Sequence, residues 1–169
     1  MPNRLSGIVD KFNALPRPAR QVALSKTIGT MVKFAGTSGL RILEMRSGHV
    51  HVRLENKKKI QNHIGGLHAA AMALLAESAT GFVVGLAVPD ESIPVIKSMK
   101  VEYKKRSRGA MEAIATLDEE TLHRIATTPK GEVLVPVSVT DETGNEPIQC
   151  EMLWAWTPKR RKDSKAAEK

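Results

Sequence analysis

The sequence predicts an α+β domain in which a largely antiparallel sheet wraps around one long central helix. Segments of alternating hydrophobicity flank a single long apolar stretch, so strands and helix are segregated along the chain. That stretch is rich in alanine, whose small side chain lets a curved sheet approach a helix axis closely. The length of 169 residues suits one domain, and a hydrophobic content of 41% is enough for one core.

Two short helices are expected ahead of the sheet. The apolar residues of the first recur at helical spacing, at positions Leu5, Ile8, Val9 and Phe12. The sequence LPRP breaks this helix, and Pro18 suits the first turn of a second helix that runs to about Lys26 or a little beyond. Gly36 and Gly39 close this N-terminal region.

Two strands, one long helix and four further strands are expected to follow. Residues 40–45 and 49–55 form a hairpin with its turn near Ser47 and Gly48, and the apolar helix covers about residues 67–88. The later strands are expected at 95–106, 110–117, 132–140 and 148–156. In the third of these, four valines alternate along one face: Val133, Val135, Val137 and Val139.

Charge is concentrated at the C-terminus. The net charge is +8, and the tail 159–169 contributes +4 of it, with six basic and two acidic residues. We therefore expect one domain over residues 1–158 and a basic, disordered tail over 159–169. Aromatic residues make up only 4% of the chain and do not alternate with Lys or Arg, so we expect no nucleic-acid partner.

Cysteine usage and hydropathy favour a cytoplasmic protein. Cys150 is the one cysteine, which excludes a disulfide framework, and we expect it to be a core residue. The first 21 residues contain no apolar segment typical of a signal peptide. Residues 67–88 are apolar enough to suggest a membrane span, but Glu77 near the centre would cost roughly 2.5–3.5 kcal/mol on insertion. We expect this helix to be buried in protein, without membrane insertion.

The stretch NHIGGLHAAAMALLAE, residues 62–77, carries the strongest functional signal. Together with VEYKKRSRG at 101–109, it resembles the hotdog-fold acyl-CoA thioesterases. The closest resemblance is to the phenylacetate-pathway-like branch, and within it to bacterial proteins of unassigned substrate; it covers roughly residues 37–157. The family pattern is matched by Asn62, Gly65, His68, Leu75 and Glu77. Ala69 and Ala70 stand where the family usually has two glycines, which narrows the space beside a thioester.

The resemblance implies a hotdog fold and an enzyme that acts on an acyl-CoA or related acyl thioester. It further implies a homodimer, or a dimer of dimers, whose sites lie at the subunit interface. Coenzyme A enters as part of the substrate, and no other cofactor is expected. His49 and His51 share a strand face, but no third ligand is evident, so no metal site is expected.

The chemistry of thioester hydrolysis assigns roles to several of these residues. The N-terminus of a helix offers free N–H groups, so the Ala69 N–H is a candidate donor to the oxyanion, and Glu77 is a candidate base or nucleophile. His68 and Asn62 are the further catalytic candidates, and Gly65 and Gly66 are candidate substrate-binding residues. Glu77 follows His68 by nine residues, which is about half a turn of offset and roughly 13 Å along a helix. The two cannot meet within one chain, so a working site needs two subunits.

Structural interpretations of the same residues remain open. Glu77 could instead be a surface carboxylate or half of an ion pair, and His68 could satisfy its ring nitrogens on nearby backbone. Asn62 either contacts substrate or water, or only pins a turn, whereas Gly65 and Gly66 serve the backbone conformation in either case. The basic runs at 56–59 and 104–109 are candidate clamps for the phosphates of coenzyme A, or simply solvated charges. The second run supplies four cations, at Lys104, Lys105, Arg106 and Arg108.

Two classes of function therefore remain. The first is a thioesterase, and the second is a non-catalytic acyl-CoA-binding or regulatory protein on the same scaffold. A third and weaker option is a hydratase or dehydratase of this fold, whose usual Asp/His site signature is not apparent.

Overall fold

The computed structural model describes residues 3–159, and so the tail predicted at 159–169 lies outside the described residues except for Lys159. The elements follow one another along the chain as α1 (Arg4–Asn13), α2 (Arg17–Met31), α3 (Lys33–Ser38), β1 (Arg41–Arg46), β2 (His49–Leu54), the 3-10 turn η1 (Lys58–Ile60), α4 (Ala69–Ala87), β3 (Ser92–Tyr103), β4 (Met111–Thr116), α5 (Glu119–Thr127), β5 (Gly131–Val135), β6 (Val137–Asp141) and β7 (Ile148–Pro158).

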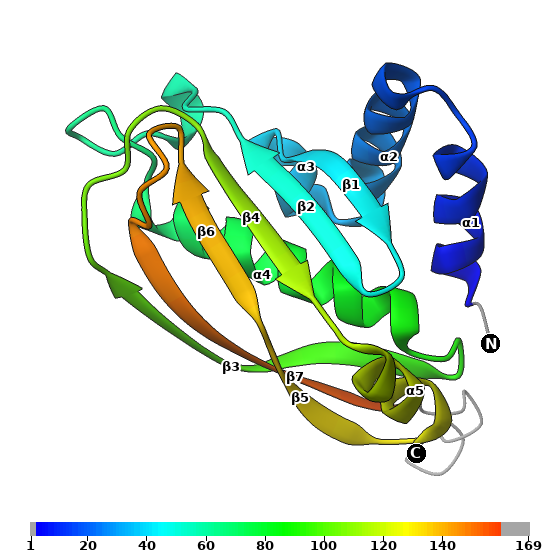
Figure 1. The fold of residues 1–169 in the computed structure, drawn as a ribbon. Coiled ribbons are helices and arrows are strands. Elements are labelled where there is room, and N and C mark those ends of the chain that lie inside the picture. The colour runs from blue at the N-terminus through cyan, green and yellow to red at the C-terminus, as the bar shows by residue number, and fades with distance from the viewer. Residues whose placement is uncertain (1–2, 160–169) are drawn as a thin grey trace, which may run out of the picture.

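The strands form two antiparallel sheets, in the orders β1-β2-β4-β6 and β3-β7-β5. Together they curve around α4, while α1, α2 and α3 lie beside β1 at one side of the molecule (Figure 1). This arrangement confirms the predicted α+β fold with one long helix inside a curved antiparallel sheet.

Helix α4 is the centre of the core. It is apolar on almost every side and buries most of its side chains against the strands, including the fully buried Leu75, Ala76, Val83 and Val84. It is long and apolar enough to cross a membrane, yet 67% of its most hydrophobic 18-residue segment is buried inside the fold. The small side chains of Ala76 and Ala79 allow the close approach of the sheet.

Three predictions about the secondary structure were wrong. The second helix continues to Met31 and is followed by the separate helix α3. The strand expected at 132–140 is two strands, because Pro136 interrupts it: β5 pairs with β7, and β6 pairs with β4. Five strands, not four, therefore follow α4 within residues 3–159.

The third error was the omission of α5 between β4 and β5. Asp118 is the N-cap of this helix, and its side chain accepts a hydrogen bond from the Thr121 N–H at 2.8 Å. Glu119 and Glu120 follow in the first turn, where negative charge is favourable. This start signal is legible in the sequence.

Helices α2 and α3 touch backbone to backbone. A Cβ atom added to Gly36 would lie 2.4 Å from the carbonyl oxygen of Gly29, a distance that real side chains essentially never show. Gly36 is therefore required for α3 to sit where it does, against the N-terminal half of α4.

Candidate functional site

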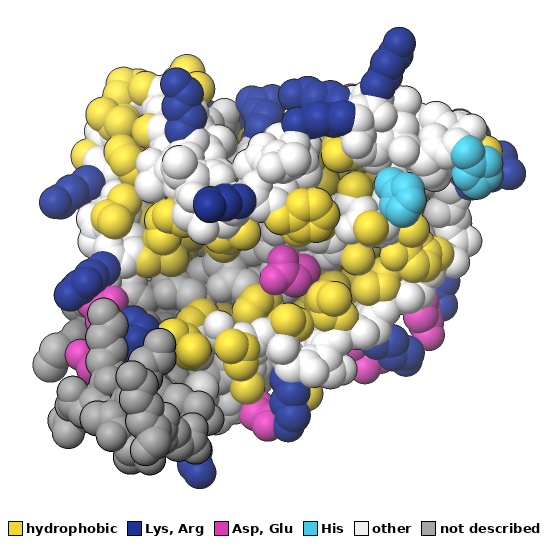
Figure 2. All heavy atoms as spheres, turned by 180° about the vertical axis from the view of Figure 1, so that it is seen from behind, with side chains coloured by type: hydrophobic (Ala, Val, Ile, Leu, Met, Phe, Trp, Pro, Cys, Tyr) yellow, Lys and Arg dark blue, Asp and Glu magenta, His cyan; other side chains and the backbone are white. Residues whose placement is uncertain are grey.

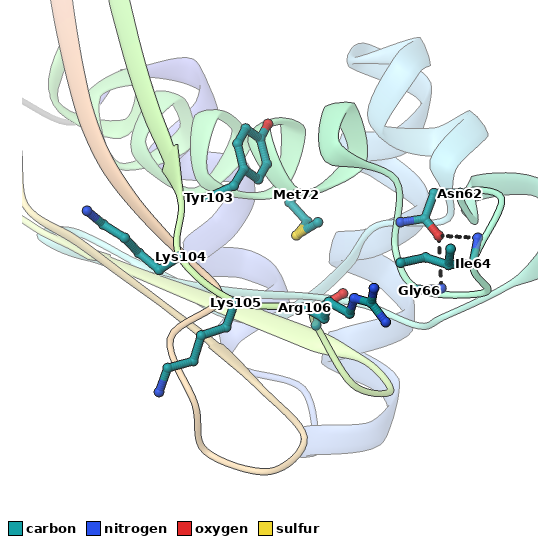
Figure 3. A pocket seen from close by; sticks show the side chains of 9 residues that line it. Asn62, Ile64, Gly66, Met72, Tyr103, Lys104, Lys105 and Arg106 are labelled. Atoms are coloured by element: carbon teal, nitrogen blue, oxygen red, sulfur yellow. Dashed lines mark hydrogen bonds between the residues drawn. The ribbon is translucent and has the colours of Figure 1, made fainter.

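The loop before α4 is organised by Asn62. Its Oδ1 accepts hydrogen bonds from the N–H groups of Ile64 at 3.0 Å and Gly66 at 3.1 Å (Figure 3). Its Nδ2 donates to the Leu67 carbonyl at 3.3 Å. Gly65 has a φ of 80°, which favours glycine. Asn62 therefore pins the turn that leads into α4, and most of its hydrogen-bonding capacity is used for this.

His68 is the N-cap of α4. Its Nδ1 accepts a hydrogen bond from the Ala70 N–H at 3.1 Å, and its carbonyl accepts from the N–H groups of Ala71 and Met72. The neutral ring must therefore carry its proton on Nε2. Ala69 is exposed, and its N–H has no hydrogen-bond acceptor within the described part of the chain. One donor at the positive end of the helix is thus free for a ligand.

Glu77 lies on the one stripe of α4 that the sheet leaves uncovered. The residues of this stripe are small or apolar apart from Glu77 and are partly or fully exposed: Ala69, Ala70, Ala73, Leu74 and Glu77. Figure 2 shows the face opposite to that of Figure 1, where hydrophobic side chains gather around a hollow that holds an acidic group. A half-buried carboxylate on an apolar stripe is costly unless it has a function or a partner.

The surroundings of Glu77 favour its neutral form. Burial raises the pKa of its carboxyl group, and the nearby Ser78 hydroxyl, at 3.5 Å, opposes this only weakly. Among the described residues no cation lies within 4.0 Å of the carboxylate. No Lys, Arg or His side chain among the described residues therefore forms an ion pair with Glu77.

A basic cavity of about 380 Å³ lies on one side of the α4 N-terminus. It brings together five of the predicted site residues: Asn62, Gly66, Lys104, Lys105 and Arg106. In Figure 3, Arg106 extends toward Asn62 and Ile64, whereas the Lys104 and Lys105 ammonium groups point away from them. Lys104 forms an ion pair with Glu102, whereas Lys105 and Arg106 have no ion pair among the described residues. This cavity can accept an anion.

Arg108 does not line this cavity. Its backbone N–H donates to Asp141 Oδ2 at 3.0 Å, which anchors the 104–110 loop beside β6. His68 and Ala70 instead border a second, mainly apolar cavity of about 260 Å³ between α3 and α4. Glu77 lines neither cavity and lies farther along the exposed stripe of α4. The structure thus separates the predicted residues into a loop anchor, a helix cap, a basic cavity and an isolated carboxylate.

Two residues that sequence reasoning did not select contribute to this region. The Tyr103 hydroxyl donates to the Ala69 carbonyl at 2.9 Å, so the end of β3 is fastened to the first turn of α4. The Phe34 side chain of α3 lines the apolar cavity although it is 65% exposed. Tyr103 lies within the VEYKKRSRG segment, but the sequence pattern predicted only the strand face on which it lies. No sequence pattern pointed to Phe34.

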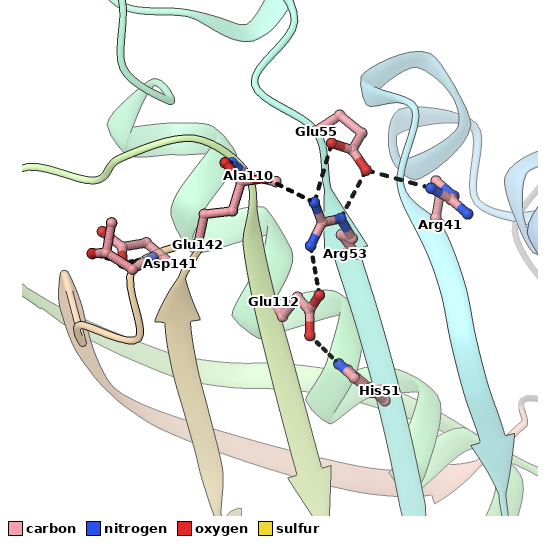
Figure 4. A network of polar contacts seen from close by, with 9 residues as sticks. Arg41, His51, Arg53, Glu55, Ala110, Glu112, Asp141 and Glu142 are labelled. Atoms are coloured by element: carbon pink, nitrogen blue, oxygen red, sulfur yellow. Dashed lines mark hydrogen bonds and ion pairs between the residues drawn. The ribbon is translucent and has the colours of Figure 1, made fainter.

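His49 and His51 are engaged elsewhere, on the outer face of the β1-β2-β4-β6 sheet. His51 Nε2 lies 2.7 Å from Glu112 Oε2, in a charged network centred on Arg53 (Figure 4). Arg53 binds Glu55 at 2.7 Å and Glu112 at 2.6 Å. Among residues 3–159 no group of three or more His, Cys, Asp or Glu side chains is arranged to hold a metal ion.

Comparisons with known proteins relate the chain to a family and to solved structures. The model of a family described as a domain of unknown function, DUF4442, matches residues 20–156. A protein of unknown function and probable thioesterase from Pseudomonas aeruginosa is similar in structure, with a TM-score of 0.70 and 25% identity over 78% of this chain and 91% of its own. No relative among the curated proteins matches the chain.

Two more distant structures show the same fold. A thioesterase from Haemophilus influenzae has a TM-score of 0.66 at 11% identity, over 82% of this chain and 94% of its own. A thioesterase enzyme from Staphylococcus aureus has a TM-score of 0.63 at 16% identity, over 75% of this chain and 99% of its own. The fold is therefore the hotdog fold of thioesterases, whereas the phenylacetate-pathway branch stays a prediction.

Proposed function

This chain belongs to the DUF4442 family of domains of unknown function, and from the structures that share its fold we propose that it is a thioester hydrolase. The substrate is an acyl-CoA or a related acyl thioester, and the site is shared by two subunits. One observation carries the proposal. Among residues 3–159, Glu77 is a half-buried carboxylate with a raised pKa and no cation beside it, on the same helix whose N-terminus offers an N–H without an acceptor.

The geometry of α4 supports a shared site. Glu77 is eight residues from Ala69, so the two are roughly 12 Å apart along the helix axis. A thioester carbonyl held by the Ala69 N–H is therefore out of reach of Glu77 in the same chain. A second copy that brings its own Glu77 level with Ala69 supplies the missing carboxylate, and two-fold symmetry then builds two identical sites.

The surface supports such a dimer. The outer edge of β3 pairs with no strand within the described chain, and β3 exposes Val95, Met99 and Tyr103. An unpaired edge strand is a template for pairing with a second strand. It lies beside the uncovered stripe of α4, so one interface can cover both. Pairing of dimers into a tetramer stays a prediction.

The proposed reaction conserves every atom. The Glu77 carboxylate of one subunit takes a proton from water, and the resulting hydroxide attacks the thioester carbon. The oxyanion accepts a hydrogen bond from the Ala69 N–H of the other subunit. The intermediate then collapses, the carbon–sulfur bond breaks, and the proton held by Glu77 passes to the thiolate. The products are a carboxylic acid and a thiol.

The test is hydrolysis of acyl-CoA esters of different chain lengths by the wild type and by Glu77→Gln. The substitution keeps the shape of the side chain and removes the base, so kcat should fall about 10²–10⁴-fold with little change in substrate binding. Glu146→Gln is the matched control, because Glu146 is exposed and forms no ion pair among the described residues. Binding of acyl-CoA without any turnover in the wild type would favour the non-catalytic acyl-CoA-binding or regulatory protein instead.

A further inference from the structure

We propose that the cavity between α3 and the first turns of α4 receives the acyl chain, and that it selects aliphatic chains of up to about eight carbons. This inference rests on the proposed function, because it names the substrate class of the same site. The cavity has a volume of about 260 Å³. Its walls come from α3, which belongs to the helices that precede the sheet, from η1 and from α4.

The chemistry of the lining favours an apolar occupant. Its apolar wall consists of Phe34, Ile60, Ala70, Ala71 and Leu74. Three polar side chains at its border each have one partner: the Ser38 hydroxyl donates to the Ala35 carbonyl at 2.7 Å, Lys59 Nζ donates to the Thr37 carbonyl, and His68 Nδ1 accepts from Ala70. The Thr37 hydroxyl and His68 Nε2 have none among the described residues. An alkyl chain here leaves water without taking a hydrogen bond from the protein.

The position of the cavity fits the proposed chemistry. At about 100° per residue, Ala70 and Leu74 lie on the side of the Glu77 stripe that faces α3. Met72 lies on the opposite side and lines the basic cavity with Tyr103 and Lys105. Ala69 lines neither cavity, but the neighbouring residue Ala70 lines the apolar one and Met72, one turn on, lines the basic one. A thioester carbonyl at Ala69 thus has an apolar cavity for its acyl group on one side and cations for phosphates on the other.

The size of the cavity limits the chain. Ligand pockets usually measure about 300–1,000 Å³, so this one is small. At about 30 Å³ for each water-sized group, it holds roughly eight or nine carbon atoms. Longer chains must extend past Phe34 into solvent or toward the partner subunit. The same fit explains an otherwise unfavourable feature, because an acyl chain would cover the 65% exposed Phe34 ring.

The experiment is a calorimetric binding series with non-hydrolysable thioether analogues of acyl-CoA that carry two to fourteen carbons. In the wild type, affinity should rise about fourfold per methylene and level off near eight carbons. Ala70→Leu adds three carbon atoms to an exposed wall position, so the plateau should come roughly three carbons earlier. Phe34→Ala should weaken binding of the eight-carbon analogue about tenfold and leave coenzyme A itself unaffected. Met31→Ala, another exposed hydrophobic residue outside the cavity, should match the wild type.

A flat dependence on chain length, or an unchanged plateau in Ala70→Leu, would overturn the acyl assignment. Because the analogues are not hydrolysed, the result does not depend on turnover. A plateau of affinity with chain length, in a protein that hydrolyses no thioester, would support the acyl cavity and contradict the proposed hydrolase activity. Turnover that depends on Glu77 without a plateau would do the reverse.

Discussion

The Tyr103 hydroxyl donates a 2.9 Å hydrogen bond to the carbonyl of Ala69, and this bond joins the free edge strand β3 to the first turn of α4. Ala69 offers its N–H to the proposed oxyanion, and its carbonyl is held by β3, the strand that borders the proposed dimer interface. The position of this backbone segment depends on a side chain from another element.

Tyr103→Phe keeps the aromatic ring in the basic cavity and removes only this hydrogen bond. The bond is solvent-accessible, so its loss should cost about 0.5–1.5 kcal/mol. For a chain of this length, we expect a decrease in Tm of about 2–4 °C per kcal/mol in a thermal scan. An unchanged Tm would mean that the bond contributes nothing to the folded state.

The carboxyl of Glu77 makes stability depend on pH. Its folded-state pKa is raised by burial, so the folded protein binds the proton more tightly than the unfolded chain does. Below the unfolded-state pKa of about 4.3, Glu77 is protonated in both states and does not lower the free energy of unfolding. As pH rises from there through the folded-state pKa, the cost of ionising the buried carboxyl develops and the folded state is destabilised. Glu77→Gln should have a higher Tm than the wild type at pH 8, and the difference should shrink toward zero at about pH 4. The same pH series on Glu146→Gln should show no such divergence; equal curves for wild type and Glu77→Gln would place Glu77 in solvent.

Two-fold symmetry fixes where α4 meets its copy. If Glu77 of one subunit is level with Ala69 of the other, the symmetry axis passes close to Ala73, midway between them. Ala73→Cys should therefore be joined to its copy by a short bis-maleimide, giving a covalent dimer on a denaturing gel. Burial raises the pKa of the remaining thiol, Cys150, to about 11, so the wild type should not react.

Ala87→Cys is the geometric control for this crosslink. It lies about 21 Å along α4 from Ala73, which separates the two copies by roughly 40 Å. Efficient crosslinking at residue 87 but not at residue 73 would show a different dimer. A monomer in sedimentation at micromolar concentration, with full hydrolytic activity, would exclude a shared site altogether.

The cations of the basic cavity should bind the phosphates of coenzyme A. Lys105→Ala and Arg106→Ala should each weaken coenzyme A binding about two- to fivefold at low salt, as expected for exposed ion pairs. The effect should largely disappear at about 0.5 M NaCl, where charges are screened. Lys104→Ala should cost less because Lys104 already pairs with Glu102. Lys130→Ala, an exposed lysine far along the chain, is the control; a loss equal to that of Lys105→Ala would indicate a nonspecific charge effect.

Local patterns predicted much of this structure. The alternation in 49–54 and 148–156 fixed two strands, and the alanine-rich stretch fixed α4, because periodicity depends only on which face is buried. The split at Pro136 was missed although a proline inside a strand argues for an interruption; the valines on either side kept the period of two. The sequence could not show that Phe34 and Leu74 line one cavity, or that Tyr103 binds Ala69, because both depend on how distant elements pack.

Because the backbones of Gly29 and Gly36 are in contact, one methyl group added at residue 36 would displace residues that lie outside this contact. Any side chain at residue 36 must push α3 away from α2, since its Cβ would meet a carbonyl oxygen at 2.4 Å. Phe34 is two residues away on the same short helix and would move with it. A substitution at residue 36, outside the acyl cavity, should therefore change the selectivity for acyl chain length. A relative with alanine at residue 36 should prefer chains of a different length even if every cavity residue is identical.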